Sequence, residues 1–206
     1  MAITESWLDN SWTDNELVIT GYNLFRTDRK TAPGGGIIVY IHTSLSAERG
    51  SDLESEQVEQ ISIEFKQFRC APILLSRFYR PPGSAVSFFD SLPNIVDSIS
   101  AENKEVHIVG GFNVDLIKKS TSKSKQILYL MEYQGFQRMV EIPTRITENS
   151  CTLIDHHYCS HPEHVLSISS PAFGLSDHNP TILVRKQSKS LKSTKKAYFT
   201  VIYRSL

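Results

Sequence analysis

Short apolar runs that stop at glycine or proline recur along the chain, a pattern typical of strands in a buried sheet. Residues 37–41 form such a run directly after Gly34-Gly35-Gly36, and residues 72–79 form another that stops at Pro81-Pro82-Gly83. Residues 61–65 alternate apolar and polar side chains, as a half-buried strand does. Further strands are predicted over residues 106–109, 152–158 and 181–184.

Two other segments show the three- and four-residue spacing of amphipathic helices. The first carries Phe88, Phe89, Leu92, Ile95, Val96 and Ile99, and Pro93 is expected to kink it. The second is expected to begin at a cap formed by Ser122 or Ser124, to bury Ile127, Leu128, Met131 and Tyr133, and to end near Gly135. Strands with two intervening helices predict an α/β (α+β) domain in which packed sheets carry outer helices.

Composition favours one intracellular domain. A chain of 206 residues with 40% hydrophobic residues is long enough to bury one substantial core. Its three cysteines have no regular spacing, which argues against a disulfide framework and suits a reducing compartment, nuclear or cytoplasmic. No apolar stretch is long enough to span a bilayer, and the acidic first twenty residues do not resemble a signal peptide. We expect a monomeric domain without a membrane anchor.

The net charge of zero hides an uneven distribution. Seven of the 22 Lys and Arg residues lie in residues 185–206, which contain no Asp or Glu, so residues 1–184 hold 15 basic against 22 acidic residues. We therefore expect a domain over residues 1–184 and a basic C-terminal tail over residues 185–206. Such a tail is either a solvated linker or a weak contact to phosphates, whereas the acidic domain suits cation binding.

Four segments place polar residues at the ends of predicted strands. They are Thr4-Glu5-Ser6-Trp7-Leu8, Gly110-Gly111-Phe112-Asn113, Leu153-Ile154-Asp155 and Ser176-Asp177-His178. Taken singly, each fits an ordinary surface acid, turn or cap. Their occurrence together, in this order, is informative.

This order and spacing resemble the endonuclease/exonuclease/phosphatase superfamily. The phrases Tyr79-Arg80-Pro81-Pro82, Pro143-Thr144-Arg145 and Ser176-Asp177-His178-Asn179-Pro180, with Glu5-Ser6-Trp7-Leu8, look like its jockey-like non-LTR retrotransposon endonuclease branch. The resemblance covers about residues 3 to 184. It implies a four-layered sandwich of two mixed β-sheets flanked by helices, and DNA as the partner.

The resemblance also implies roles for individual residues. A carboxylate matching Glu5 would hold Mg²⁺, a hard cation that prefers oxygen ligands and neutralises charge on a scissile phosphate. Asp155 would orient His178, whose ring contacts the phosphate in the transition state. Asp177 would lie beside the metal as a further ligand and catalytic residue.

The remaining implied roles concern the substrate. Asn113 would position the substrate or the attacking water, Tyr79 would offer its phenol to the phosphate, and Arg145 would bind the substrate. All of these residue types are present in the chain.

Two departures from the resemblance are expected to impair the chemistry. The family motif reads Gly-Asp-Phe/Leu-Asn, and Gly111 stands at its Asp position, so the carboxylate that would activate water is missing. A positioned base contributes about 10²- to 10⁴-fold in rate. In the family a strand bearing a metal-site Asn also precedes the Glu motif, whereas only Met1-Ala2-Ile3-Thr4 precede Glu5. The first strand is therefore expected to be missing.

A local cluster of metal-ligating residue types is a separate candidate. It contains His156, His157, Cys159, His161 and His164. Strand alternation sends His157 and Cys159 to one face and His156 to the other, and the spacing matches no familiar four-ligand zinc pattern. A strand followed by a polar loop is the simpler interpretation.

Three functions compete. The first is a Mg²⁺-dependent DNA endonuclease of a non-LTR retrotransposon, impaired by Gly111 and the missing strand. The alternative is a non-catalytic remnant or nucleic-acid-binding module. A phosphatase acting on a small phosphorylated substrate ranks lowest, because the quoted phrases favour the retrotransposon branch.

Overall fold

A six-stranded mixed sheet forms the centre of the molecule. The computed structural model describes residues 1–29, 34–83, 87–118, 120–174, 176–186 and 197–201. The strands of the sheet are, in spatial order, β4 (Ser46–Arg49), β5 (Glu59–Lys66), β6 (Ile73–Tyr79), β7 (Glu105–Gly111), β11 (Asp155–Cys159) and β8 (Gln137–Arg138). Only the central pair β6 and β7 is parallel within this sheet.

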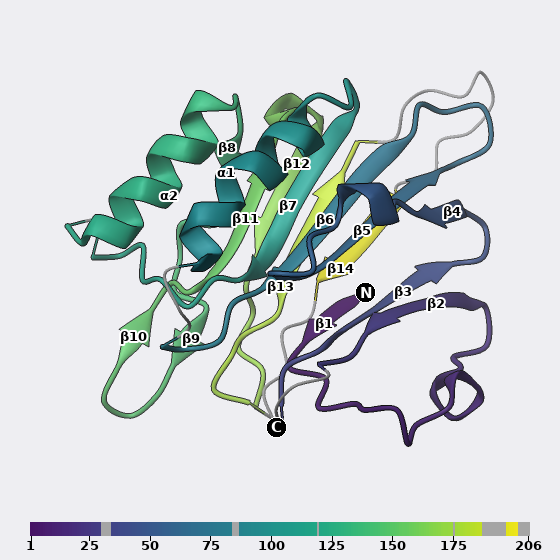
Figure 1. The fold of residues 1–206 in the computed structure, drawn as a ribbon, viewed down its shortest axis with the longest axis horizontal. Coiled ribbons are helices and arrows are strands. Elements are labelled where there is room, and N and C mark those ends of the chain that lie inside the picture. The colour runs from purple at the N-terminus through teal and green to yellow at the C-terminus, as the bar shows by residue number, and fades with distance from the viewer. Residues whose placement is uncertain (30–33, 84–86, 119, 175, 187–196, 202–206) are drawn as a thin grey trace.

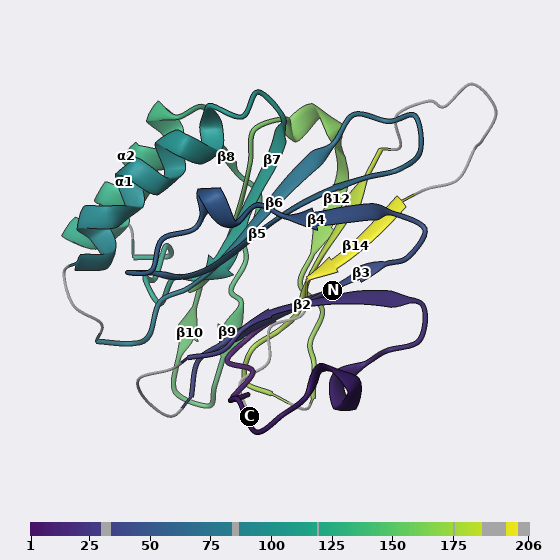
Figure 2. The same ribbon diagram turned by 45° about the vertical axis from the view of Figure 1, so that its right-hand side comes forward.

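A second layer packs against this sheet (Figures 1 and 2). One part contains β1 (Ala2–Thr4), β3 (Ile37–His42) and β2 (Tyr22–Thr27) in that order. The other contains β12 (Val165–Ser169), β13 (Thr181–Arg185) and β14 (Ala197–Val201), and β14 also contacts β1. Because β14 pairs with β13, this sheet includes residues that follow the predicted domain boundary at residue 184.

Helices α1 (Ser87–Ser100) and α2 (Ser122–Tyr133) lie side by side on the face of the central sheet that points away from the second layer (Figure 2). Their apolar stripes share one core with the sheet, including Leu92, Ile99, Phe78 and Ile108. Pro93 lies inside α1, as predicted. The prediction of packed sheets with outer helices is confirmed.

Details of α2 differ from the prediction. Its N-cap is Thr121, whose hydroxyl accepts a hydrogen bond from the Ser124 backbone at 3.1 Å, so the predicted caps Ser122 and Ser124 are wrong. Tyr133 is 75% exposed, so its predicted burial is also wrong. Gly135, with φ +77°, follows the end of the helix as expected.

The predicted strands are present, but the run over residues 152–158 is divided. Its first residue belongs to a hairpin formed by β9 (Arg145–Ile146) and β10 (Cys151–Thr152), and the chain leaves that ladder before β11 begins. Three short 3-10 turns complete the described elements: η1 (Asp14–Leu17), η2 (Ser51–Leu53) and η3 (Pro162–His164). All three cysteines are free thiols, and none of the described helices has the length and apolarity required to cross a bilayer.

Alternation along the central strands separates two chemically different faces. Val106 and Ile108 on β7 join the core beneath the helices, so Glu105, His107 and Gly111 face the second layer. On β11, Tyr158 packs beneath the helices, so Asp155 and its alternate neighbours also face the second layer. The space between the layers is apolar at β3, β5 and β6 and polar along β7 and β11.

Candidate active site

Three strand ends of the central sheet meet at one edge. Tyr79, the last residue of β6, pairs with Gly111, the last residue of β7, and Gly111 pairs with Asp155, the first residue of β11. Because β6 and β7 are parallel and β11 is antiparallel to them, these three positions lie side by side. All three face the second layer, where the segments that follow β1 and precede β13 complete the site.

The best-defined pair at this edge is Asp155 and His178. Asp155 is buried, and its Oδ2 accepts a hydrogen bond from Nδ1 of His178 at 2.8 Å. Burial alone would lower the pKa of His178, but this hydrogen bond and the charges of Asp155 and Asp177 raise it above its ordinary value. Since Nδ1 is committed to Asp155, contact between the ring and a substrate falls to Nε2.

Backbone contacts from the β9 segment fix this pair. The hydroxyl of Thr144 accepts hydrogen bonds from the backbone N–H groups of Ile154 and Asp155, at 3.3 and 3.0 Å. The backbone N–H of Asn179 donates to the Thr144 carbonyl at 2.7 Å. Thr144 is fully buried, so one side chain and its carbonyl tie the Asp155 and His178 segments together.

Asp177 and Arg145 form an ion pair at the rim of the site. The Arg145 Nε donates to Asp177 Oδ2 at 2.7 Å. The Arg145 side chain is 42% exposed and the Asp177 side chain is 34% exposed. Arg145 also forms a β-bridge with His178. The pair therefore contributes to the position of the histidine, and one carboxylate oxygen of Asp177 is already occupied.

On the other side of Gly111, Glu5 lies against the phenol of Tyr79. Burial raises the pKa of Tyr79, and a hydrogen bond with Glu5 raises it further, so the phenol stays protonated and donates to the carboxylate. The Arg29 guanidinium lies 5.6 Å from the centre of the same ring. Glu5 and Trp7 both have positive φ angles, +55° and +56°, a strained backbone of the kind that clusters at functional sites.

Asn113 also has a left-handed backbone, with φ +50°. Its Nδ2 donates to the Arg80 carbonyl at 2.7 Å, and the Arg80 guanidinium donates to the carbonyls of Phe112 and Asn113 at 3.1 and 3.3 Å. Arg80 is only 2% exposed and lies over the ring of Phe89. This reciprocal arrangement holds the loop after β7 in place.

The two adjacent glycines at the end of β7 have different steric surroundings. A Cβ on Gly110 would lie 2.2 Å from the Phe78 carbonyl oxygen, so no side chain fits there. A Cβ on Gly111 would meet Asp155 Oδ1 at 3.4 Å and Tyr79 Cδ2 at 3.5 Å, which is ordinary contact. Gly111 is therefore a position where a side chain can be accommodated at the centre of the site.

The donor set suits a hard cation that binds few protein ligands. Mg²⁺ is commonly held by one or two carboxylates together with water and substrate phosphates. Glu5 supplies one carboxylate, which accepts from the Tyr79 phenol, and Asp155 and Asp177 are bonded to His178 and Arg145. An aspartate at position 111 would supply another oxygen donor, so the arrangement fits Mg²⁺ and has a gap where a second ligand or base would lie.

The structure thus brings Glu5, Tyr79, Asp155 and His178 to one edge around Gly111, with Asn113, Asp177 and Arg145 attached through their neighbours. Their catalytic roles stay predictions. Thr144 and Arg80 lie within the quoted sequence motifs, but the motifs predict no role for either residue. The only sequence signal for Thr144 and Arg80 is that each lies next to a predicted site residue. Their roles depend on buried hydrogen bonds to segments that are distant in the sequence.

No family model and no curated protein sequence matches the chain. Solved structures do match. The endonuclease domain of TRAS1, a telomere-specific non-LTR retrotransposon, is 14% identical with a TM-score of 0.69, and the match covers 83% of each chain. The catalytic domain of Xenopus laevis APE2 is 14% identical with a TM-score of 0.65, covering 90% of this chain and 82% of that one.

An endonuclease/exonuclease/phosphatase family protein from Bacteroides thetaiotaomicron is 15% identical with a TM-score of 0.51, covering 92% of this chain and 72% of that one. At these identities the likeness establishes a shared fold. The chain therefore has the fold of endonuclease/exonuclease/phosphatase proteins, as the sequence resemblance predicted.

Proposed function

We propose that the chain is a divalent-metal-dependent DNA endonuclease domain of the non-LTR retrotransposon type, whose rate is limited by the absence of a carboxylate at Gly111. The observation that carries this proposal is the Asp155–His178 pair, which lies beside Gly111, a strand-end position where a Cβ fits. The similarity in fold to the TRAS1 endonuclease domain supports DNA as the substrate.

The chemistry would divide among the residues at this edge. The raised pKa of His178 favours an imidazolium, which would bind a non-bridging phosphate oxygen through Nε2 and stabilise its growing charge. The Tyr79 phenol, kept protonated, would donate to the same phosphate or hold Glu5 in place. Mg²⁺ held by Glu5 would supply charge neutralisation on the scissile group.

Water activation is the step for which this site has no evident residue. Asp155 bonds to His178 and Asp177 bonds to Arg145, so each of these carboxylates already has a cationic or ring N–H partner to hold. Asp115 does not substitute, because its Oδ1 accepts hydrogen bonds from the Leu153 and Ile117 backbones. We therefore expect very slow hydrolysis.

Nicking of supercoiled plasmid with Mg²⁺ tests the proposal. Gly111→Asp should raise the nicking rate by at least about 10²-fold over the unsubstituted chain, the lower end of what a positioned base contributes. Gly111→Asn is the matched control, because it fills nearly the same volume without supplying a base. A second substitution, His178→Ala, in the Gly111→Asp background should remove most of the gain.

Equal rates for Gly111→Asp and Gly111→Asn would contradict the assignment of position 111. Fast nicking by the unsubstituted chain would contradict the impairment while supporting the nuclease. A non-catalytic nucleic-acid-binding domain is the second candidate, and Gly111 itself favours it. It predicts Mg²⁺-independent DNA binding and no nicking by any of these variants.

A further inference from the structure

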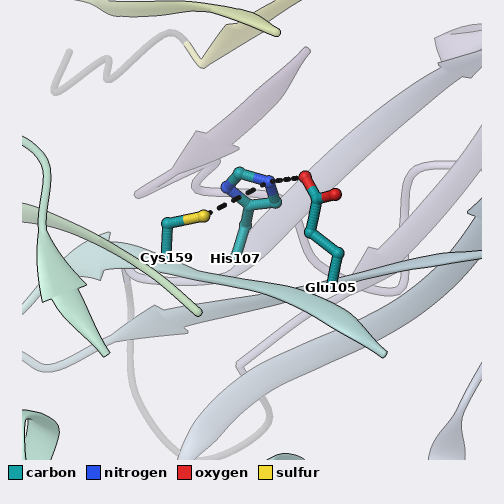
Figure 3. Close-up of side chains that lie close together, drawn as sticks. All are labelled: Glu105, His107 and Cys159. Carbon is teal, nitrogen blue, oxygen red and sulfur yellow. Dashed lines mark hydrogen bonds and ion pairs between the residues drawn. The ribbon is translucent and has the colours of Figure 1, made fainter. Parts of the chain in front are cut away.

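At the opposite ends of β7 and β11, a second cluster of ionisable side chains faces the second layer. Glu105 and His107 lie on β7, and Cys159 ends β11 directly opposite His107 (Figure 3). All three are buried, with exposed fractions of 8%, 5% and 0%. The imidazole of His107 points between the thiol and the carboxylate in Figure 3.

The spacing of their donor atoms suits a single small cation. His107 Nε2 lies 3.1 Å from Glu105 Oε1 and 3.9 Å from Cys159 Sγ, and the three donor atoms all lie within 4.8 Å of one another. Ligand atoms bound to Zn²⁺ at 2.0 to 2.3 Å with tetrahedral angles are about 3.3 to 3.6 Å apart. Small side-chain rotations would therefore bring all three onto one ion.

We propose that Glu105, His107 and Cys159 form a Zn²⁺ site that joins β7 to β11. A mixed set of thiolate, imidazole and carboxylate suits zinc better than Mg²⁺ or Ca²⁺, which prefer oxygen alone. His164 contacts the same carboxylate from a more open side: its side chain is 41% exposed, and its Nδ1 lies 2.7 Å from Glu105 Oε2. This inference is independent of the proposed nuclease function.

The surrounding hydrogen bonds would hold these ligands in place. His107 Nδ1 lies 2.9 Å from His157 Nε2, a second contact that fixes the ring and directs Nε2 to the centre of the cluster. Arg185 donates to both oxygens of Glu105, with Nε at 2.6 Å from Oε1. A carboxylate oxygen has two lone pairs. Glu105 Oε1 can therefore keep its hydrogen bond from Arg185 and bind a cation in place of its hydrogen bond with His107.

Other uses of the thiol fit the surroundings less well. Burial raises the pKa of Cys159 to about 12, and reactive cysteines have a lowered pKa and partial exposure. Cys70, Cys151 and Cys159 are all free thiols, so Cys159 takes part in no disulfide. Coordination is the chemistry that accounts for a buried thiol beside an imidazole and a carboxylate.

Cobalt substitution tests the proposal directly. Reduced, metal-free protein titrated with Co²⁺ should develop a near-ultraviolet thiolate-to-Co²⁺ charge-transfer band that saturates at one equivalent and is abolished by Zn²⁺. The double variant Cys70→Ser/Cys151→Ser retains Cys159 as its only thiol and should keep the band. Cys159→Ser should lose it, and Cys151→Ser alone is the matched single substitution.

Zinc should also raise the melting temperature of the unsubstituted protein relative to the chelator-treated protein, and this difference should vanish in Cys159→Ser. The absence of a charge-transfer band in both the unsubstituted protein and the Cys70→Ser/Cys151→Ser variant would overturn the proposal. So would a band of equal intensity in Cys159→Ser. The first of these outcomes does not require the Cys159 variant to fold.

Discussion

The same two strands, β7 and β11, carry a polar cluster at each end, and the two clusters differ in how their charges are satisfied. At one end Gly111 lies opposite Asp155, and at the other His107 lies opposite Cys159. Each end contains a histidine bonded to a carboxylate and an arginine bonded to a carboxylate. At the Gly111 end the arginine pair is part-exposed, whereas the Arg185–Glu105 pair has exposed fractions of only 9% and 6%.

This difference distinguishes a cluster whose charges are buried among protein partners from a cluster that is partly exposed to solvent. Glu105 accepts hydrogen bonds from Arg185, His107 and His164, which outweigh the effect of burial and hold its pKa well below its usual range. Protein donors therefore surround this carboxylate, and the Zn²⁺ proposed above would replace only the hydrogen bond from His107. The His178 ring bonds to Asp155 through Nδ1, which leaves Nε2 for a ligand at the strand ends where Gly111 lies.

The largest expected effect is on stability at the Glu105 end. Arg185→Met should lower the free energy of unfolding by about 3 kcal/mol, because removing one partner leaves Glu105 as a buried charge. Urea denaturation at neutral pH measures the difference. Arg138→Met is the control, since its partner Glu141 is 73% exposed and should cost less than about 1 kcal/mol. A loss below about 1 kcal/mol for Arg185→Met would show that the two ends are energetically alike.

A carboxylate introduced at position 111 should lower the stability of the protein unless a cation is present. Gly111→Asp places a second carboxylate beside Asp155 and should destabilise the metal-free protein by roughly 2 kcal/mol, since like charges share a largely buried site. Mg²⁺ should recover most of this loss. Thermal unfolding with and without Mg²⁺ measures both effects. If Gly111→Asn shows the same Mg²⁺ response, the cation is not binding the new carboxylate.

A smaller effect is expected from Asp155→Asn, which should lower the pKa of His178 by removing its anionic partner. Because the folded-state pKa is raised, the pair stabilises the fold fully below the unfolded pKa of about 6.5 and loses that contribution as pH rises through the folded value. The stability difference between the two proteins should therefore be about 1.5 kcal/mol at pH 6 and smaller at pH 9. NMR titration of the His178 ring gives the pKa directly, and an unchanged value would remove Asp155 from its proposed role.

The smallest effect concerns the exposed ion pair. Arg145→Met should change the free energy of unfolding by less than about 1 kcal/mol, because solvent screens the pair with Asp177. Under the nuclease proposal it should still weaken DNA binding in a salt-dependent manner. Binding to a labelled duplex at two salt concentrations, beside the urea measurement, separates the two roles. Strong destabilisation with unchanged binding would make Arg145 a structural residue.

Sequence patterns predicted the strands, whereas the roles of the residues at the Gly111 end stay predictions. Apolar runs that end at glycine or proline locate strand ends, and strand ends of a sheet meet at its edges, so Tyr79, Asp155 and His178 were found from local signals. The resemblance then supplied the expectation for position 111. The resemblance implies that Asp155 orients His178, and the structure contains the hydrogen bond between them.

The sequence does not predict the cluster at the Glu105 end of β7 and β11, because its contacts join segments that are far apart in the chain. Its ion pair joins Glu105 to Arg185, 80 positions apart, and neither residue lies in a motif. The spacing of the local histidines and Cys159 along the chain does not include the neighbouring strand, which contributes Glu105 and His107. Similarly, Tyr133 fits the spacing of a core position although it is exposed, because the helix packs through Ile127 and Met131.

Gly110 and Gly111 should consequently respond differently to mutational drift. A side chain at Gly110 would collide with the Phe78 carbonyl oxygen, so selection for folding alone is enough to preserve this glycine. Gly111 meets no such barrier, and only selection on chemistry would determine its identity. Among related sequences under selection for folding alone, position 110 should stay glycine while position 111 varies. A glycine codon ending in a pyrimidine becomes an aspartate codon by one base change.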